Sequence, residues 1–237
     1  MIHKLKLLKK DTIANGTMAF SWEKPLGFDF MAGQYGDIKL IAPPETDAEG
    51  NIRSLSLASA PYEDYLVTAT RMRDSAFKRV IKDMPIGSQM ELDAPHGDFT
   101  LHKSVTTPAV FVIGGIGVTP VRSIVAQATH DRLPHRITLL YSNKTLADAA
   151  FMADFEQFTA ENRNFDFIPV MTNVTAGEWK GETGYIDEAM LKKYVPDLSS
   201  PIFYLSGPPA MVKAMRQIVI ASGANEDNIR TEEFAGY

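Results

Sequence analysis

A glycine-rich turn near the middle of the chain has the composition of a phosphate-binding loop. Residues 111–120 read Phe-Val-Ile-Gly-Gly-Ile-Gly-Val-Thr-Pro, so an apolar stretch runs into the turn and a helix is expected after it. Glycine lets backbone N–H groups approach a phosphate closely, and the positive end of a following helix favours negative charge. Thr119 suits the helix cap and Pro120 the first helical turn. The glycine spacing is neither G-x-G-x-x-G nor that of a P-loop, so a tight turn without a ligand is the alternative.

A second turn has the same strand–turn–helix character. Residues 204–211 read Tyr-Leu-Ser-Gly-Pro-Pro-Ala-Met, which places Ser206 at the carboxyl end of an expected parallel strand. Nucleotides bind at that edge of open α/β sheets, and a hydroxyl there can hydrogen-bond a nicotinamide carboxamide. A rigid Gly-Pro-Pro helix entry without chemistry is the alternative.

An arginine and a serine lie close together among small residues in the first half. The stretch Ile52–Pro61 carries Arg53 and Ser56 among further serines and alanines. A planar guanidinium suits a diphosphate, and the small side chains leave room for a flat ring. A lone arginine on a strand is also typical of a surface salt bridge, which is the alternative here.

The first hundred residues have the pattern of short strands broken by turns. Lysines alternate with apolar residues over Met1–Lys10, which predicts a strand, because a signal peptide needs a longer unbroken apolar stretch. One short helix is expected over Ser75–Lys82. Frequent Gly and Pro between the strands favour an antiparallel barrel or sandwich. Further strands are expected at Thr17–Trp22, Asp37–Ile41, Ser54–Leu57, Leu66–Arg71 and Gln89–Leu92.

After about residue 103 the pattern changes. The continuous apolar run Ala109–Ile113 is expected for a strand that is covered on both faces. Strands and helices then alternate, which predicts an α/β doubly wound parallel sheet. We place a domain boundary here, giving domains of residues 1–103 and 104–237. Strands are expected at Ile137–Tyr141, Phe165–Met171, Ile202–Leu205 and Ile229–Glu233, and helices at Val121–Thr129, Ala149–Ala160, Asp187–Tyr194 and Ala210–Ala221.

Composition limits the chemistry that this chain can perform. Its 237 residues are 45% apolar and 22% charged with a formal charge of −5, which argues against a nucleic-acid surface. The absence of cysteine excludes disulfides, thiolate nucleophiles and iron–sulfur clusters ligated by this chain. The histidines show no metal-ligand spacing, so no metal site is expected. No window approaches the roughly 20 apolar residues of a transmembrane helix, so we expect a cytoplasmic protein with no membrane partner.

Together these segments resemble the ferredoxin–NADP reductase superfamily, in its small bacterial flavin- and flavodoxin-reductase branch without an iron–sulfur domain. The resemblance runs over nearly the whole chain, and the matching pieces occur in the family's order. It implies an FAD-binding antiparallel β-barrel followed by an NAD(P)-binding α/β domain. It also implies an enzyme that moves hydride from NAD(P)H to bound FAD and then passes electrons to an acceptor. The matching pieces are Ala32–Tyr35, Arg53–Ser56, Ala94–Phe99, Gly114–Pro120, Tyr204–Met211 and Glu232–Phe234.

The resemblance assigns the flavin to residues of the first half. Arg53 would pair with the flavin diphosphate, and Ser56 would hydrogen-bond near flavin N5, the atom that receives hydride. The start of the helix at Ser75 and the side chain of Lys78 would offset phosphate charge. The implied flavin contacts are Arg53, Ser54, Leu55, Ser56, Ala69, Thr70, Arg71, Ser75, Ala76, Phe77 and Lys78.

The same resemblance assigns the nicotinamide nucleotide to the second half. Gly115, Gly117 and Thr119 would bind it, while Ser206, Gly207 and Pro208 would line its nicotinamide end. Glu233 or its neighbour Glu232 would lie near the flavin edge and relay a proton. Ser142 and Lys144 could hold a 2′-phosphate, which favours NADPH slightly over NADH. The terminal Tyr237 would stack on the flavin or form a frayed end.

Two residues depart from the family's pattern. The tyrosine that packs against the flavin is Leu55 here, which removes an aromatic contribution of about 0.5–1.5 kcal/mol. That change would weaken flavin retention or open one flavin face, and it leaves FMN as a possible cofactor beside FAD. Many members carry cysteine where this chain has Ser206; a hydroxyl keeps the hydrogen bond, so slower chemistry is the worst expected result.

The electron acceptor is left open by the sequence. Free flavin, ferredoxin, flavodoxin, a ferric chelate or a partner oxygenase would each fit the resemblance. The main alternative is a flavin-bearing electron-transfer subunit of a larger complex without activity of its own. A redox-dead binding module and a siderophore-type ferric reductase are further alternatives.

Overall fold

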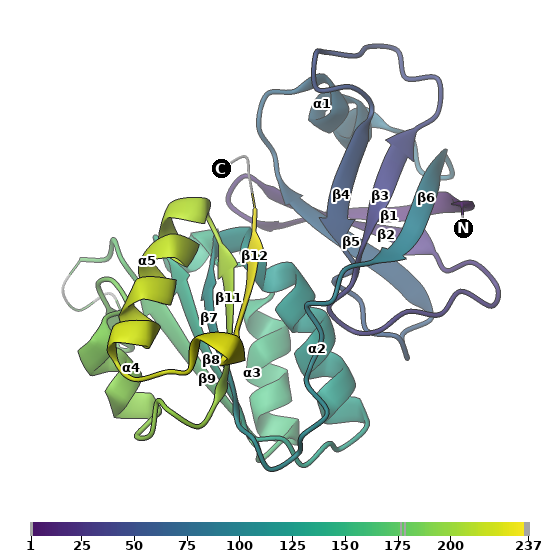
Figure 1. The fold of residues 1–237 in the computed structure, drawn as a ribbon. Helices are drawn as coiled ribbons and strands as arrows, with labels where there is room; N and C mark the ends of the chain where they lie inside the picture. The colour runs from purple at the N-terminus through teal and green to yellow at the C-terminus, as the bar shows by residue number, and fades with distance from the viewer. Residues whose placement is uncertain (1, 176, 178, 235–237) are drawn as a thin grey trace.

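The computed structural model of the chain describes residues 2–175, 177 and 179–234. Two six-stranded sheets follow one another along the chain. Figure 1 shows the first as a purple-to-blue body beside the green and yellow second one. An antiparallel barrel followed by a parallel sheet with helices was predicted, and this fold class is confirmed.

The first sheet is antiparallel and has the strand order β4-β3-β6-β1-β2-β5. The N–H of Ala58, just after β4, donates to the carbonyl of Val67 on β5 at 2.7 Å, so the two end strands are linked and the sheet curls into a barrel. Helix α1 (Ala76–Asp83) buries Phe77 and Ile81 in the barrel core. The strands are β1 (Ile2–Ala14), β2 (Thr17–Glu23), β3 (Tyr35–Leu40), β4 (Ile52–Ser56), β5 (Tyr65–Arg71) and β6 (Gln89–His96).

The lysine-rich start of the chain forms β1, as the alternation predicted. Leu5 and Leu7 are fully buried in the barrel core, whereas Lys4 and Lys6 are exposed. Successive side chains of a strand point to opposite faces, so this period of two places leucine inside and lysine in solvent. The strand continues to Ala14 and pairs with both β2 and β6.

The second sheet is parallel and has the order β10-β9-β8-β7-β11-β12. Its order reverses direction at β7, as in doubly wound folds. The strands are β7 (Ala109–Gly114), β8 (Ile137–Asn143), β9 (Phe165–Met171), β10 (Glu182–Thr183), β11 (Ile202–Gly207) and β12 (Ile229–Glu233). The helices are α2 (Thr119–His130), α3 (Met152–Glu161), α4 (Glu188–Tyr194) and α5 (Pro209–Ala221), with short 3₁₀ turns at Gly115–Val118, Leu146–Asp148 and Glu226–Asn228.

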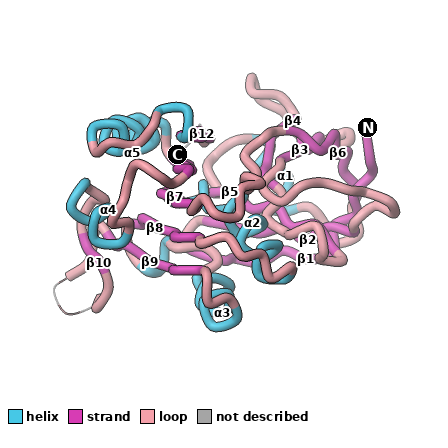
Figure 2. The backbone as a smooth tube through the Cα atoms, turned by 60° about the horizontal axis from the view of Figure 1, so that its bottom comes forward, coloured by secondary structure: helices cyan, strands magenta, loops and turns pink. Residues whose placement is uncertain are grey.

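The central strand β7 is buried on both faces. Phe111 and Ile113 belong to the apolar cluster under α2 and α3, whereas Val110 and Val112 belong to the cluster under α4 and α5. Figure 2 shows α3 and α5 on opposite sides of the strands. The continuous apolar run of the sequence thus serves two cores, which is the reason it does not alternate.

One helix begins later than predicted. The expected start of α3 at Ala149 was wrong, because Leu146–Asp148 form a separate 3₁₀ turn and α3 begins at Met152. Thr145 and Asp148 cap this turn reciprocally, and Phe151 adopts a left-handed φ of 60° that separates turn from helix. The two-residue strand β10 was not predicted.

The connection from β6 to β7 carries the chain from one sheet to the other, and the predicted domain boundary falls inside it. Tyr204 of β11 anchors this connection, since its hydroxyl accepts the N–H of His102 at 2.9 Å. Within the described ranges, no helix has the length and apolar character needed to cross a membrane.

Candidate functional site

A cavity of about 860 Å³ opens at the carboxyl edge of the parallel sheet and is closed on its other side by the barrel. This is the edge where ligands bind in open α/β sheets. Its walls come from the ends of β7 and β8, from the segment after β5, and from the apolar side of α5. They include Gly114, Gly115, Ser142, Asn143, Lys144, Arg71, Met72, Arg73, Pro208, Met211, Met215 and Ile218.

The two predicted turns pack directly against each other at this edge. A Cβ placed on Gly117 would lie 2.6 Å from the backbone N of Gly207, and one on Gly114 would lie 2.3 Å from Sδ of Met211. Close packing against backbone therefore requires glycine at position 117, independently of any ligand, whereas at Gly114 the contact is with a flexible methionine side chain. Gly115 has a φ of 51° and lines the cavity, so its backbone is the part of the turn that faces a ligand.

Thr119 does not cap the helix, so that prediction was wrong. It is the first residue of α2 and is buried, and its hydroxyl donates to the carbonyl of Ile116 at 3.0 Å. The 3₁₀ turn at Gly115–Val118 moves the helix start relative to the glycines, and Val118 takes the cap position. Pro120 lies in the first helical turn, as predicted.

Ser206 is fully buried at the end of β11, and its hydroxyl has no hydrogen-bond partner among the described residues. A buried hydroxyl without a partner is costly, and such groups are often completed by a ligand. The backbone of Ser206 packs against Gly117, because a Cβ on Gly117 would lie 2.7 Å from the carbonyl carbon of Ser206. Pro208 of the same turn lines the cavity and precedes α5.

The two glutamates that end β12 differ in environment. Glu233 is exposed, whereas Glu232 is largely buried, pairs in register with Ser206, and has an Oε2 atom without a partner in the described part of the chain. Burial raises the pKa of Glu232 to about 7, and the nearby charge of Asp98 adds to this rise. Of the two residues named by the sequence, Glu232 therefore has the properties of a proton-exchanging group at neutral pH.

In the barrel half, Arg53 lies on β4 and is engaged by its own loop. Its Nη2 is 2.7 Å from Oε2 of Glu49, and its guanidinium lies 5.2 Å from the ring centre of Phe77. The ring of Phe77 is buried in the barrel core, and the guanidinium of Arg53 packs over this ring. Arg53 thus forms the surface salt bridge that the sequence analysis gave as the alternative to a phosphate contact.

The short helix expected over Ser75–Lys82 is observed as α1, which begins at Ala76. Ser75 is the N-cap, and its hydroxyl accepts the N–H of Lys78 at 3.4 Å. The N–H of Ala76 instead donates to the carboxylate of Asp47 at 2.7 Å. Burial, with the nearby charges of Arg73 and Arg53, lowers the pKa of Lys78 to about 8.

The remaining barrel residues named by the sequence line two different surfaces. Thr70 and Ala69 are buried on β5, and Ala69 shares an apolar cluster with Ile116 of the glycine turn. Ser56 is buried at the end of β4 and Leu55 packs on the barrel core. The hydroxyl of Ser54, which is exposed, donates to the carboxylate of Asp37 at 2.5 Å.

Arg71 connects the two halves. Its Nη2 donates to the carbonyl of Asp148 at 3.2 Å and its Nη1 to that of Asn15 at the same distance. It lines the large cavity with Arg73, whereas the sequence had placed it beside the flavin alone. Ser142 and Lys144 line the same cavity from β8, and Lys144 is exposed.

Sequence reasoning missed several residues of this region. Arg73, Met211 and Met215 line the cavity, and Asp47 and Glu49 contact the predicted phosphate site. The pair Arg71 and Arg73 after a strand was a usable signal, whereas nothing in the local pattern pointed to Asp47. Tyr237 lies outside the described residues.

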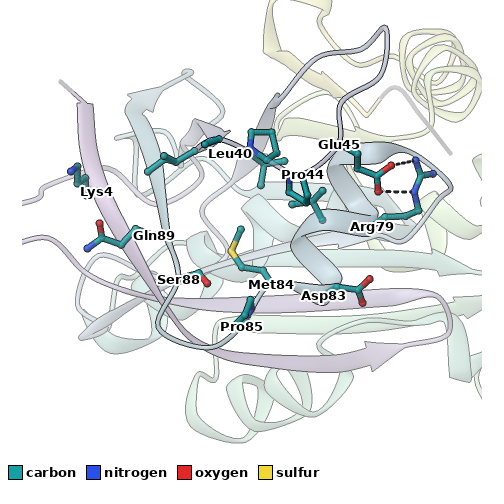
Figure 3. Close-up of a pocket in the computed structure, with 14 residues that line it drawn as sticks. Lys4, Leu40, Pro44, Glu45, Arg79, Asp83, Met84, Pro85, Ser88 and Gln89 are labelled. Carbon is teal, nitrogen blue, oxygen red and sulfur yellow. Dashed lines mark hydrogen bonds and ion pairs between the residues drawn. The ribbon is translucent and has the colours of Figure 1, made fainter.

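A second cavity, of about 650 Å³, lies on the far side of the barrel (Figure 3). Pro44 and Glu45 form one wall and Met84 and Pro85 another. Glu45 and Arg79 pair across one end at 2.7 Å. None of the residues that the sequence singled out lines this cavity.

Sequence comparisons agree with this geometry. The family model of the oxidoreductase NAD-binding domain matches residues 111–217, from β7 into α5. The chain is 26% identical over 98% of its length to the glycine betaine monooxygenase reductase subunit of Chromohalobacter salexigens, and it spans 64% of that protein. It is 29% identical over 88% of its length to a Na(+)-translocating NADH-quinone reductase subunit of Serratia proteamaculans, and spans 55% of that protein. The chain thus covers only part of the curated relatives that it matches.

Solved structures share the whole architecture. The flavohem-like FAD/NAD binding domain of nitric oxide dioxygenase from Vibrio cholerae superposes with a TM-score of 0.84 at 20% identity, covering 98% of both chains. A ferredoxin NADP+ reductase from Neisseria gonorrhoeae with bound FAD and NADP gives 0.81 at 22% identity, again covering 98% of both chains. The chain thus resembles an oxidoreductase NAD-binding domain over residues 111–217, and it shares the two-part fold of ferredoxin NADP+ reductases. These comparisons agree with the family that the sequence predicts.

Proposed function

We propose that this chain is a member of the ferredoxin–NADP reductase superfamily and a flavoprotein oxidoreductase, which takes hydride from NAD(P)H and passes electrons to an acceptor. One observation carries the proposal: the cavity at the carboxyl edge of the parallel sheet is lined on its barrel side by Arg71–Arg73, at the end of the barrel strand β5. A nucleotide in that cavity would lie against the wall of the barrel. The relatives whose names identify them as reductase subunits support the same activity.

The residues present fit a flavin. Arg53 and Lys78 are cationic and lie near the N-terminal amide of α1, and the carboxylates held by Arg53 and by this amide support a site for anionic oxygen. Ser56 and Thr70 would line the ring system, and Leu55 would contact one of its faces. A bound flavin supplies the redox chemistry, while the protein supplies orientation and electrostatics.

The residues present also fit a nicotinamide nucleotide. The backbone of Gly115 would approach its diphosphate, and the unpartnered hydroxyl of Ser206 would bond its carboxamide. Glu232 would hold or release a proton near the flavin edge, in place of the exposed Glu233. Thr119 would act only through its support of the turn, because its hydroxyl already bonds Ile116.

We propose NADPH as the preferred nucleotide by a small margin. Arg71, Arg73 and Lys144 give the cavity a positive rim, and a 2′-phosphate needs cations. Turnover measured with each nucleotide tests this preference. Turnover at least as fast with NADH at equal concentration would contradict it.

The acceptor is proposed at the level of class. One relative is named as a monooxygenase reductase subunit, and others as a phenol hydroxylase protein and as reductase subunits. These names favour a partner protein, such as an oxygenase, over free flavin. They equally favour the alternative of a flavin-bearing subunit that works only in a complex, in which case the native protein would co-migrate with its partner in gel filtration.

The visible spectrum of the purified protein tests the proposed function. After reconstitution with FAD, we expect flavin absorption that bleaches when NADPH or NADH is added without oxygen. Arg53→Ala should purify with little flavin, and a full flavin complement in that variant would contradict the placement of the phosphates. A protein that stays colourless with excess FAD or FMN would overturn the proposal.

A further inference from the structure

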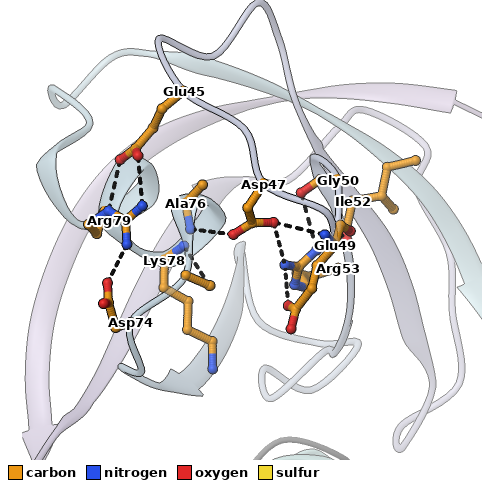
Figure 4. A network of polar contacts seen from close by, with 11 residues as sticks. Glu45, Asp47, Glu49, Gly50, Ile52, Arg53, Asp74, Ala76, Lys78 and Arg79 are labelled. Carbon is orange, nitrogen blue, oxygen red and sulfur yellow. Dashed lines mark hydrogen bonds and ion pairs between the residues drawn. The ribbon is translucent and has the colours of Figure 1, made fainter.

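Two carboxylates occupy the place that the sequence assigns to the flavin diphosphate (Figure 4). Asp47 Oδ2 accepts the N–H of Ala76, the first residue of α1, at 2.7 Å. Glu49 Oε2 lies 2.7 Å from Nη2 of Arg53, and Asp47 Oδ1 lies 4.0 Å from the same nitrogen. The amide and the guanidinium that would hold phosphate oxygens therefore hold carboxylate oxygens of the chain itself.

The hydrogen-bond donors of Arg53 are directed into the same loop. Its Nη1 donates to the carbonyls of Ile52 at 2.7 Å and Glu49 at 2.9 Å, and its Nη2 donates to the carboxylate of Glu49. A guanidinium binds a phosphate best through two parallel N–H groups. Arg53 can present such a pair only if the loop moves away.

The residues Ala42–Gly50, which we call the acidic loop, lie between β3 and β4. Ala42 and Gly50 at its ends have left-handed φ values of 43° and 73°. Glu45 fastens it to Arg79 of α1 at 2.7 Å (Figure 4). The side chains of Glu49 and Asp47 are 64% and 31% exposed, so both can return to solvent without crossing a core.

The site contains a further cation, Lys78, that no carboxylate of the acidic loop contacts. Lys78 lies one turn into α1 and donates to the carbonyl of Arg71 at 2.5 Å, with no carboxylate in contact among the described residues. Its pKa is lowered by burial and by the cations Arg73 and Arg53. Glu49 of the acidic loop acts on Lys78 only through its charge, and a ligand with two phosphates would bring further negative charge to this lysine.

We propose that Asp47 and Glu49 determine how tightly this protein holds a phosphate-bearing flavin, because their carboxylates compete with the flavin phosphates for Arg53 and the amide of Ala76. Flavin binds only when the acidic loop leaves the site. The free energy needed to break the contacts of the loop with Arg53 and Ala76 therefore weakens the observed flavin affinity. The inference rests on the proposed flavin function and deepens it. It predicts a protein that exchanges or loses its flavin readily.

The test uses isosteric neutral variants of the full chain. Asp47→Asn with Glu49→Gln keeps the shape of the acidic loop and removes both charges. Dissociation constants for FAD, FMN and riboflavin are measured by quenching of flavin fluorescence. We expect FAD to bind at least about tenfold more tightly to the double variant, while riboflavin, which has no phosphate, changes by less than about twofold.

A matched control separates a local effect from a change in net charge. Glu156→Gln with Asp166→Asn removes two exposed carboxylates from α3 and β9, in the other half of the molecule. This control should leave FAD affinity within about twofold of wild type. The inference is overturned if FAD affinity stays constant or falls in the Asp47 and Glu49 variant, if riboflavin gains as much as FAD, or if the control gains equally.

Inorganic pyrophosphate distinguishes this inference from the proposed function. We measure its binding by titration calorimetry in wild type and in the Asp47 and Glu49 variant. If no flavin binds but pyrophosphate binds more tightly to the variant, the two carboxylates do compete with phosphate, and the proposed flavin function is wrong. If FAD binds equally to both proteins, the competition falls and the function stands. If neither ligand binds to either protein, both are wrong.

Discussion

Arg122 on α2 and Glu63 of the barrel half form an ion pair that joins the two halves of the molecule. Arg122 Nη2 donates to Glu63 Oε1 at 3.1 Å, its Nη1 contacts Oε2, and both side chains are about nine-tenths buried. Asp154 of α3 completes the group at 2.8 Å from the same Nη2. Next to it, the hydroxyl of Ser123 donates to the carbonyl of Ser59 at 2.6 Å. The helix that follows the glycine turn is thus fixed to the segment that follows β4.

Removing one partner of this pair should destabilise the protein strongly. Glu63→Gln leaves the buried guanidinium with only Asp154, so we expect a loss of about 3 kcal/mol in the free energy of unfolding. A double-mutant cycle with Arg122→Met, followed by urea unfolding, measures the coupling. The exposed pair Lys192 and Glu188 on α4 is the control, and its coupling should stay below about 0.5 kcal/mol. A coupling no larger for Glu63 and Arg122 than for this control would contradict the role of the pair.

The buried carboxyl of Glu232 should make stability depend on pH. Its pKa is about 7 in the folded protein and 4.5 as the ordinary value, so the folded state binds the proton more tightly. The protonated Glu232 therefore contributes its full stabilisation of the folded state below about pH 4.5. This contribution is lost as pH rises through about 7, and the free energy of unfolding falls by roughly 3 kcal/mol in total.

Glu232→Gln removes this dependence and should be more stable than wild type above pH 7. Unfolding by urea at several pH values measures the difference. The exposed neighbour provides the control, since Glu233→Gln should leave the pH profile of wild type unchanged. Parallel profiles for wild type and Glu232→Gln would show that the carboxyl titrates in its ordinary range.

A methyl group at Gly117 should disrupt the contact between the two turns. The new Cβ would meet backbone atoms of Ser206 and Gly207 at 2.6–2.8 Å, and backbone yields less easily than a side chain. We expect Gly117→Ala to cost about 1–3 kcal/mol of stability and to weaken NAD(P)H binding, while FAD binding stays unchanged.

Gly27→Ala is the comparison for that variant. Gly27 has a φ of 73° with no atom within 4 Å of a new Cβ, so only backbone strain of about 1 kcal/mol is added. Its nucleotide affinity should equal that of wild type. Equal nucleotide affinity in Gly117→Ala would mean that the turn tolerates displacement and does not position the nucleotide.

His102 should make the protein sensitive to mild acid. Burial lowers its pKa below the ordinary 6.5, and the nearby His135 and Arg230 oppose protonation further. Its Nε2 lies 2.8 Å from the carbonyl of Thr107, so Nε2 carries the hydrogen and Nδ1 faces the hydroxyl of Tyr204. The unfolded chain takes up the proton first, so the free energy of unfolding should fall as pH drops from about 6.5 toward the folded pKa.

Thermal unfolding between pH 7 and pH 5 measures this loss. His102→Gln cannot titrate and should flatten the profile over that interval, although its stability at pH 7 is lower. The exposed His130 is the control, because His130→Gln should keep the wild-type slope. An unchanged slope in His102→Gln would assign the acid sensitivity to other groups.

The order and type of the elements were fixed by local pattern. The lysine–leucine alternation of β1, the apolar run of β7 and the strand–turn–helix units each have a period that the sequence displays within ten residues. The short helix expected over Ser75–Lys82 was found, and Pro120 lies in the first turn of α2 as expected. The exact starts of α2 and α3 were missed because a short 3₁₀ turn precedes each helix, and a 3₁₀ turn has no strong residue signature.

Only the tertiary structure decided which charges meet. Asp47 reaches the helix amide of Ala76, and Glu63 reaches Arg122 fifty-nine residues later, in contacts that no periodicity encodes. The choice between Glu232 and Glu233 likewise depends on which face of β12 is covered, since adjacent residues of a strand point to opposite sides. Local sequence determines hydrogen bonding along the chain, whereas burial and electrostatic pairing arise only when distant segments pack together.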